Sequence, residues 1–218
     1  AALGGWRDDD ADCHSTLSFR HDAECLALAM LNRDIERGDR VCMLMRNDVD
    51  FCLVDMACLI AGITNVPLYR NIQDSHLEFI LDQTEAVALV LSDAGVSRRV
   101  AMMLAARPAN LLIIGKRDVD LPEAIHNWDT PRTTLEHLID EGRILHEKAP
   151  DRPTELKAMI QPRDVATIIY TSGTTGNPKG VVLAHESLAF SGCTGFNGIQ
   201  ELRAGTEERA LSFLPMAH

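Results

Sequence analysis

The 218-residue sequence lacks the cysteine patterns that mark disulfide or zinc proteins. Its six cysteines form no CxxC pair, and no set of cysteines and histidines has the spacing of zinc ligands. Cys42, Cys52 and Cys58 lie in apolar runs, which favours buried, reduced thiols. We therefore expect no bound metal from these residues and a reducing, cytoplasmic location.

Positive charge is also scarce, because 21 Lys and Arg face 32 Asp and Glu, giving a net charge of −11. With no basic stripe, a nucleic-acid partner is not expected. The first residues contain no positive segment followed by an apolar core, so we expect no secretory signal. No apolar stretch approaches the roughly 20 residues that cross a bilayer, which predicts a soluble protein without a transmembrane segment. Any anionic ligand must therefore be held by local dipoles, a lysine or a metal.

What the sequence does have is an alternation of helical periodicity with short apolar runs. The apolar run at residues 87–91 (VALVL) is typical of a strand covered on both faces. The alternation predicts an α/β fold with a mostly parallel sheet flanked by helices. The predicted helices lie at residues 20–37, 48–61, 74–84 and 95–106, and the predicted strands at 41–45, 63–68, 87–91 and 111–115.

The second half of the chain is less regular. Residues 116–161 are rich in Pro, Asp, Glu and Arg, and we interpret them as an irregular excursion with a short amphipathic piece at 133–139. The chain stops in a Pro-bearing loop just after an apolar run, which indicates a piece of a longer protein. The remaining predictions are strands at 165–170, 181–184 and 210–214, a loop at 172–179, and a helix from 185 to about 202 that glycines weaken.

The segment YTSGTTGNPKG, residues 170–180, carries the strongest chemical signal. Residues 172–176 have small or hydroxyl side chains, so they expose backbone N–H groups, and their glycines permit positive φ. Lys179 adds a positive charge, which makes the segment suited to bind phosphates. It is not a Walker A loop, because Asn-Pro-Lys follows Gly176 and the next predicted element is a strand. The alternative, an ordinary polar hairpin turn, is disfavoured by the length of the motif.

This segment resembles the phosphate-loop signature YTSG[ST]TGxPKG of the adenylate-forming (AMP-binding) superfamily, which includes acyl-CoA synthetases and luciferases. Flanking segments extend the resemblance over nearly the whole chain. Residues 135–173 and the final LSFLPMAH resemble the long-chain fatty acyl-CoA synthetase branch in particular. Arg70 departs from the family pattern, which usually has proline there.

The resemblance implies that residues 1–218 are an incomplete N-terminal AMP-binding domain of a long-chain fatty acid–CoA ligase. In such an enzyme the fatty acid attacks the α-phosphate of ATP, giving acyl-AMP and pyrophosphate, and coenzyme A then displaces AMP. Lys179 and His218 become the catalytic candidates, His218 through its match to a Leu-Pro-x-x-His motif. The implied phosphate-binding residues are Thr171, Ser172, Gly173, Thr174, Thr175, Gly176, Lys179 and Gly180.

The resemblance also implies Mg²⁺, whose ligand would lie outside this chain, as would the ribose-binding aspartate. The 218 residues alone are therefore expected to be inactive. Two alternatives stay open. One is a non-catalytic nucleotide-binding or interaction module. The other is a ligase for another acid, either an aryl-acid ligase or a fatty acyl-AMP ligase that feeds a carrier protein. Peripheral membrane contact and the oligomeric state of the longer protein are also open.

Overall fold

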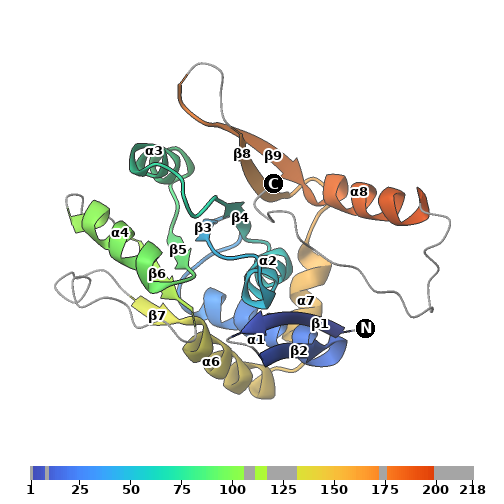
Figure 1. The fold of residues 1–218 in the computed structure, drawn as a ribbon. Coiled ribbons are helices and arrows are strands. Elements are labelled where there is room, and N and C mark those ends of the chain that lie inside the picture. The colour runs from blue at the N-terminus through green and yellow to red at the C-terminus, as the bar shows by residue number, and fades with distance from the viewer. Residues whose placement is uncertain (1, 8–9, 106–110, 117–131, 172–175, 199–218) are drawn as a thin grey trace.

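The computed structural model describes residues 2–7, 10–105, 111–116, 132–171 and 176–198, and all structural statements concern these residues. Figure 1 shows a twisted sheet with helices on both faces. The sheet has seven strands in the order β7-β6-β5-β3-β4-β8-β9, and each neighbouring pair is parallel except β8 and β9. The α/β prediction is therefore confirmed.

The bounds of the elements match most of the predictions to within a few residues. The strands of the sheet are β3 (Arg40–Leu44), β4 (Thr64–Pro67), β5 (Ala88–Leu91), β6 (Leu112–Gly115), β7 (Arg132–Thr134), β8 (Val165–Thr171) and β9 (Lys179–Ala184). The helices are α1 (Thr16–Asn32), α2 (Val49–Ala61), α3 (Asp74–Thr84), α4 (Ala94–Ala105), α6 (Leu135–Lys148), α7 (Arg152–Met159) and α8 (His185–Gly198). None of these described helices is both long and apolar enough to cross a membrane.

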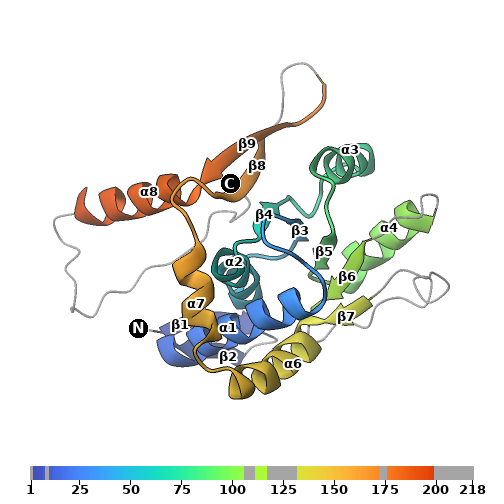
Figure 2. The ribbon, with the colours of Figure 1, turned by 180° about the vertical axis from the view of Figure 1, so that it is seen from behind.

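Two hydrophobic cores lie between the sheet and the helices that flank it, and Figures 1 and 2 show the arrangement of these helices from the front and from behind. Side chains alternate across a strand, so Val41 and Met43 of β3 enter the core formed with α1, α2 and α6. Cys42 and Leu44 enter the core formed with α3 and α4. Burial on both faces explains why the central strands are continuous apolar runs.

The order of the strands creates a topological switch point beside β3. The chain leaves β3 through α2 to reach β4 on one side, and returns through α3 to β5 on the other side. The loops that follow β3 and β5 therefore run to opposite faces of the sheet. In open α/β sheets this leaves a crevice at the carboxyl ends of the strands, where ligands commonly bind.

A predicted helix boundary was wrong for an identifiable reason. The helix predicted to continue to residue 37 ends at Asn32, and Gly38 (φ 85°) lies in a turn whose N–H donates to the Gly62 carbonyl. α3 begins at Asp74, and the side chain of its N-cap residue, Gln73, makes no capping hydrogen bond. Gly62, in the left-handed conformation with φ 72°, ends α2 just after the predicted helix end at 61.

The prediction that residues 116–161 are irregular was wrong for the second part of this range. Residues 132–159 form β7, α6 and α7, and α6 packs in the same core as α1. Residues 117–131 lie outside the described part of the chain, as does the strand predicted at 210–214. Near the N-terminus the chain forms an antiparallel pair that the sequence analysis did not predict, β1 (Ala2–Arg7) with β2 (Asp10–Ser15).

Asp55 of α2 gives the fold a measurable dependence on pH. Burial raises the pKa of its carboxyl group to about 6, although the Asn65 side chain donates a hydrogen bond to it. The raised pKa means that the folded chain binds this proton more tightly than the unfolded chain, whose value is about 3.8. The resulting stability is complete below about pH 4 and is lost as the pH rises towards 6.

We therefore expect Asp55→Asn to raise the free energy of unfolding at pH 7 by about 2 kcal/mol, since each pKa unit is worth about 1.4 kcal/mol and the group is partly solvated. At pH 4 the two proteins should differ little. Urea denaturation at both pH values measures the effect, with the exposed Asp151→Asn as the control. An equal gain at both pH values would contradict the titration of Asp55 as its cause.

Candidate functional site

The phosphate-loop motif lies at the turn of a β-hairpin. β8 is rich in β-branched residues, and it pairs with β9 so that Tyr170 faces Gly180 and Thr171 faces Lys179. The prediction that residues after Thr171 connect two strands is confirmed, although β9 begins at Lys179 and not at 181. In Figures 1 and 2 the hairpin extends beyond the other strands of the sheet.

Gly176 has the backbone conformation that the motif predicts. Its φ of 107° is one that side-chain-bearing residues rarely adopt, and a Cβ there would meet nothing within 4 Å. The backbone conformation at position 176 therefore favours glycine, although there is room for a side chain. Such a residue can turn its N–H group towards a ligand that neighbouring amides also face.

The two ends of the loop are held together at the last pair of the hairpin. Lys179 is exposed, and its carbonyl oxygen accepts a 3.5 Å hydrogen bond from the Thr171 hydroxyl. The candidate residues Ser172, Gly173, Thr174 and Thr175 lie outside the described residues, and so does His218. The structure therefore brings together Thr171, Gly176, Lys179 and Gly180 from the candidate set.

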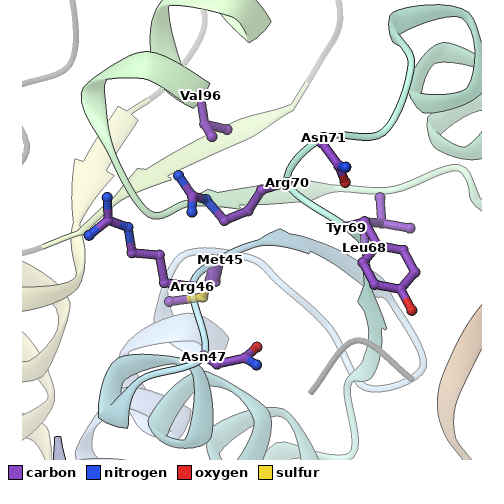
Figure 3. A pocket seen from close by; sticks show the side chains of 8 residues that line it. All are labelled: Met45, Arg46, Asn47, Leu68, Tyr69, Arg70, Asn71 and Val96. Atoms are coloured by element: carbon purple, nitrogen blue, oxygen red, sulfur yellow. The ribbon is translucent and has the colours of Figure 1, made fainter. Parts of the chain in front are cut away.

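A cavity of about 560 Å³ lies at the carboxyl ends of the strands, at the switch point. The loop after β3 and the loop after β4 form most of its wall, and α4 contributes Val96 (Figure 3). The full lining is Met45, Arg46, Asn47, Leu68, Tyr69, Arg70, Asn71 and Val96.

Two arginines share one carboxylate beside this cavity. Arg70 contacts Asp93 at 2.5 Å and Arg46 contacts it at 3.8 Å, and Figure 3 shows the two arginine side chains extending in the same direction. Burial alone would raise the pKa of Asp93, but the Val96 N–H, the Ser92 hydroxyl and the two guanidiniums lower it. Two cations against one anion leave a local positive charge in an acidic chain.

This pair of arginines was missed by the sequence analysis. Arg46 and Arg70 are far apart in the sequence and form no basic stripe, but each lies two or three residues after the end of a strand of the parallel sheet. Because parallel strands end at the same edge, residues after adjacent strands meet there. The location of both arginines shortly after strands was the feature of the sequence that could have identified the pair. Arg70, which departs from the family pattern, has its partner in Asp93.

A second cavity, of about 400 Å³, lies beside the phosphate-loop hairpin. It shares Leu68, Tyr69 and Asn71 with the first cavity. Thr171 and Pro178 line its other side. The loop after β4 thus lines both the cavity beside the arginine pair and the cavity beside the phosphate loop. Among the described residues, no group of three His, Cys, Asp or Glu side chains could hold a metal ion.

Known proteins are similar to this chain over most of its length. Residues 14–218 match the AMP-binding enzyme family. Long-chain-fatty-acid–CoA ligase FadD15 of Mycobacterium tuberculosis is 30% identical over 194 residues, which cover 88% of this chain and 30% of that protein. Carboxylic acid reductase of the same organism is 32% identical over 192 residues, covering 84% of this chain and 16% of that protein. The chain therefore spans less than a third of the length of these relatives.

A solved structure agrees with the fold. The adenylation domain of a carboxylate reductase from Mycobacterium chelonae superimposes with a TM-score of 0.67 at 20% identity, and the match covers 87% of this chain and 32% of that one. At this identity the likeness concerns the fold alone.

Proposed function

This chain belongs to the AMP-binding enzyme family, and we propose that it is part of an ATP-dependent ligase that activates a long-chain fatty acid. In the proposed reaction the carboxylate attacks the α-phosphate of ATP, forming acyl-AMP and releasing pyrophosphate. The thiol of coenzyme A then attacks the acyl carbon, and AMP leaves as the thioester forms.

One observation carries the proposal: a β-hairpin that presents Thr171, Gly176 and Lys179 at its turn. The backbone of Gly176 and the ammonium of Lys179 are suited to the β- and γ-phosphates of ATP, which become the leaving group. Stabilising the charge on this leaving group lowers the barrier without a covalent intermediate on the protein. Lys179 is the proposed catalytic residue of the described part of the chain, and we retain His218 as a candidate beside the acyl carboxylate.

Mg²⁺ commonly accompanies ATP, but the described residues do not offer it a site. They contain no suitable group of three acidic, His or Cys side chains. We therefore assign no step to a metal held by these residues. A metal ligand elsewhere in the longer protein stays the prediction, in keeping with the inactivity expected of these 218 residues alone.

The fatty acid is the proposed substrate because of the likeness to long-chain-fatty-acid–CoA ligases. An apolar tunnel should raise specificity with chain length, since each buried CH₂ contributes about 0.8 kcal/mol. We expect acid-dependent ATP–pyrophosphate exchange by the longer protein to increase from acetate to oleate by up to about 4-fold per CH₂ until the tunnel is full. A maximum at acetate or benzoate would move the proposal to another acid.

The likeness to carboxylic acid reductase favours a second candidate with the same first step. In that candidate the acyl group passes from the adenylate to an acceptor other than coenzyme A. Release of AMP from preformed acyl-AMP, measured with and without coenzyme A, separates the two. Stimulation by coenzyme A with formation of acyl-CoA supports the ligase, and its absence supports the second candidate.

A further inference from the structure

The phosphate-loop hairpin has little backbone pairing with the rest of the sheet, although β4 and β8 run side by side. β8 pairs with β4 at one position, Asn65 with Thr167. By comparison, β3 pairs with β5 at four consecutive positions. Side chains at the two ends of the hairpin therefore add to the contacts that orient it.

The end of the hairpin remote from the loop is held by an ion pair. Arg37 bonds the carboxylate of Asp164, and it also donates a 2.7 Å hydrogen bond to the Met159 carbonyl. The N–H of His185, which follows β9, donates a 3.0 Å hydrogen bond to the Asp164 carbonyl. This anchor lies at the start of β8 and cannot by itself fix the direction of the other end.

At the loop end, Tyr170 reaches across to a different layer of the fold. Its hydroxyl donates a 2.7 Å hydrogen bond to Oε1 of Gln83, the penultimate residue of α3. Burial raises the pKa of the Tyr170 phenol, so the hydroxyl keeps its proton at neutral pH and can donate. Its ring also packs against the core that contains α3 and α4.

The same ring explains the glycine opposite it. A Cβ at Gly180 would lie 3.1 Å from Cζ of Tyr170 and 2.9 Å from a methyl group of Ile168. The tyrosine thus lies where a side chain at Gly180 would be, an arrangement by which aromatic rings stabilise glycines in sheets. Gly180 therefore accommodates Tyr170, a role distinct from the phosphate contact that the motif suggests.

We propose that the Tyr170–Gln83 hydrogen bond and the packing of Tyr170 against Gly180 position Lys179 and Thr171 for phosphate binding. Thr171 and Lys179 directly follow and precede the Tyr170–Gly180 pair, so fixing that pair against α3 fixes the direction of both. Tyr170 and Gln83 are positioning residues, because they act through Lys179. The inference rests on the proposed adenylation reaction.

The test uses the longer protein and separates its two half-reactions. Tyr170→Phe and Gln83→Met each remove the hydrogen bond and keep most of the side-chain volume. Each should slow acid-dependent ATP–pyrophosphate exchange about 3- to 10-fold, the range expected for one hydrogen bond. Thioester formation from preformed acyl-AMP should not change. A merely structural effect would slow both steps equally, and that result would overturn the proposal.

Three further variants test the same hydrogen bond. Gln83→Glu keeps an oxygen acceptor and should restore exchange close to the unsubstituted rate, while Ser75→Ala on the exposed surface of α3 is the neutral control. The double variant Tyr170→Phe/Gln83→Met should be no slower than either single one, because both remove the same bond. Additive losses would overturn the proposal.

Hydrogen exchange in the 218-residue chain gives a readout that needs no activity. Tyr170→Phe and Gln83→Met should speed exchange of the amides at 179–181 and leave those of α1 unchanged. Unchanged exchange at 179–181 would overturn the positioning role even in an active enzyme. If the unsubstituted longer protein shows no acid-dependent exchange of pyrophosphate while these amides respond as expected, the proposed function fails and the structural role of Tyr170 stands.

Discussion

Gly142→Ala is expected to destabilise this chain by about 3 kcal/mol or more. Gly142 lies on α6 where this helix crosses α1, and a Cβ added there would lie 1.9 Å from the Cys25 carbonyl oxygen and 2.4 Å from its carbon. Both atoms belong to the backbone, so no side chain can move aside. The helices would have to separate, and the core residues between them would lose their packing.

Urea or thermal unfolding of the 218-residue chain measures this loss. Gly195→Ala is the matched control, because Gly195 also lies in a helix but a Cβ there would meet nothing within 4 Å. Alanine in a helix is favoured over glycine by up to about 1 kcal/mol, so the control should be neutral or stabilising. Equal effects of the two substitutions would show that helix propensity, and not the helix crossing, decides the result.

This crossing also shows where prediction from the sequence stops. The central strands were predictable because burial on both faces requires apolar residues at consecutive positions, as at 88–91. α6 has a narrow apolar stripe among charged residues, and only the part at 133–139 was recognised. Its stability depends on contact with α1, which local periodicity does not record. The β1–β2 pair contains Gly and Asp, which are uncommon in strands.

In the candidate site, too, local features could be predicted from the sequence, whereas contacts between distant elements could not. The motif at 170–180 is local, so its hairpin and the positive φ of Gly176 could be predicted from residue types. The pairing of Arg46 and Arg70 through Asp93 depends on which strands are neighbours. The contact of Tyr170 with Gln83 joins two elements whose sequences give no sign of it. Spatial arrangements of this kind require the order of the strands before they can be inferred.

The largest effect on activity is expected at Lys179. In the longer protein, Lys179→Ala should slow adenylation by roughly 30- to 1,000-fold, which corresponds to about 2–4 kcal/mol for one charged contact with the phosphates. Lys179 is the cation of the described loop end and lies opposite Thr171. Gly176→Val should slow the same step, because valine is strained at a φ of 107°.

The second half-reaction decides whether this assignment is right. Once pyrophosphate has left, the loop no longer carries the charge that Lys179 neutralises, so coenzyme A should consume preformed acyl-AMP at an unchanged rate. Lys179→Arg should recover part of the loss because it keeps the charge but not the geometry of a compact ammonium. Lys148→Ala, an exposed lysine at the end of α6, controls for the loss of one positive charge on an acidic chain. If preformed acyl-AMP reacted as slowly as ATP and acid, Lys179 would act in both steps and its assignment to pyrophosphate release would be wrong.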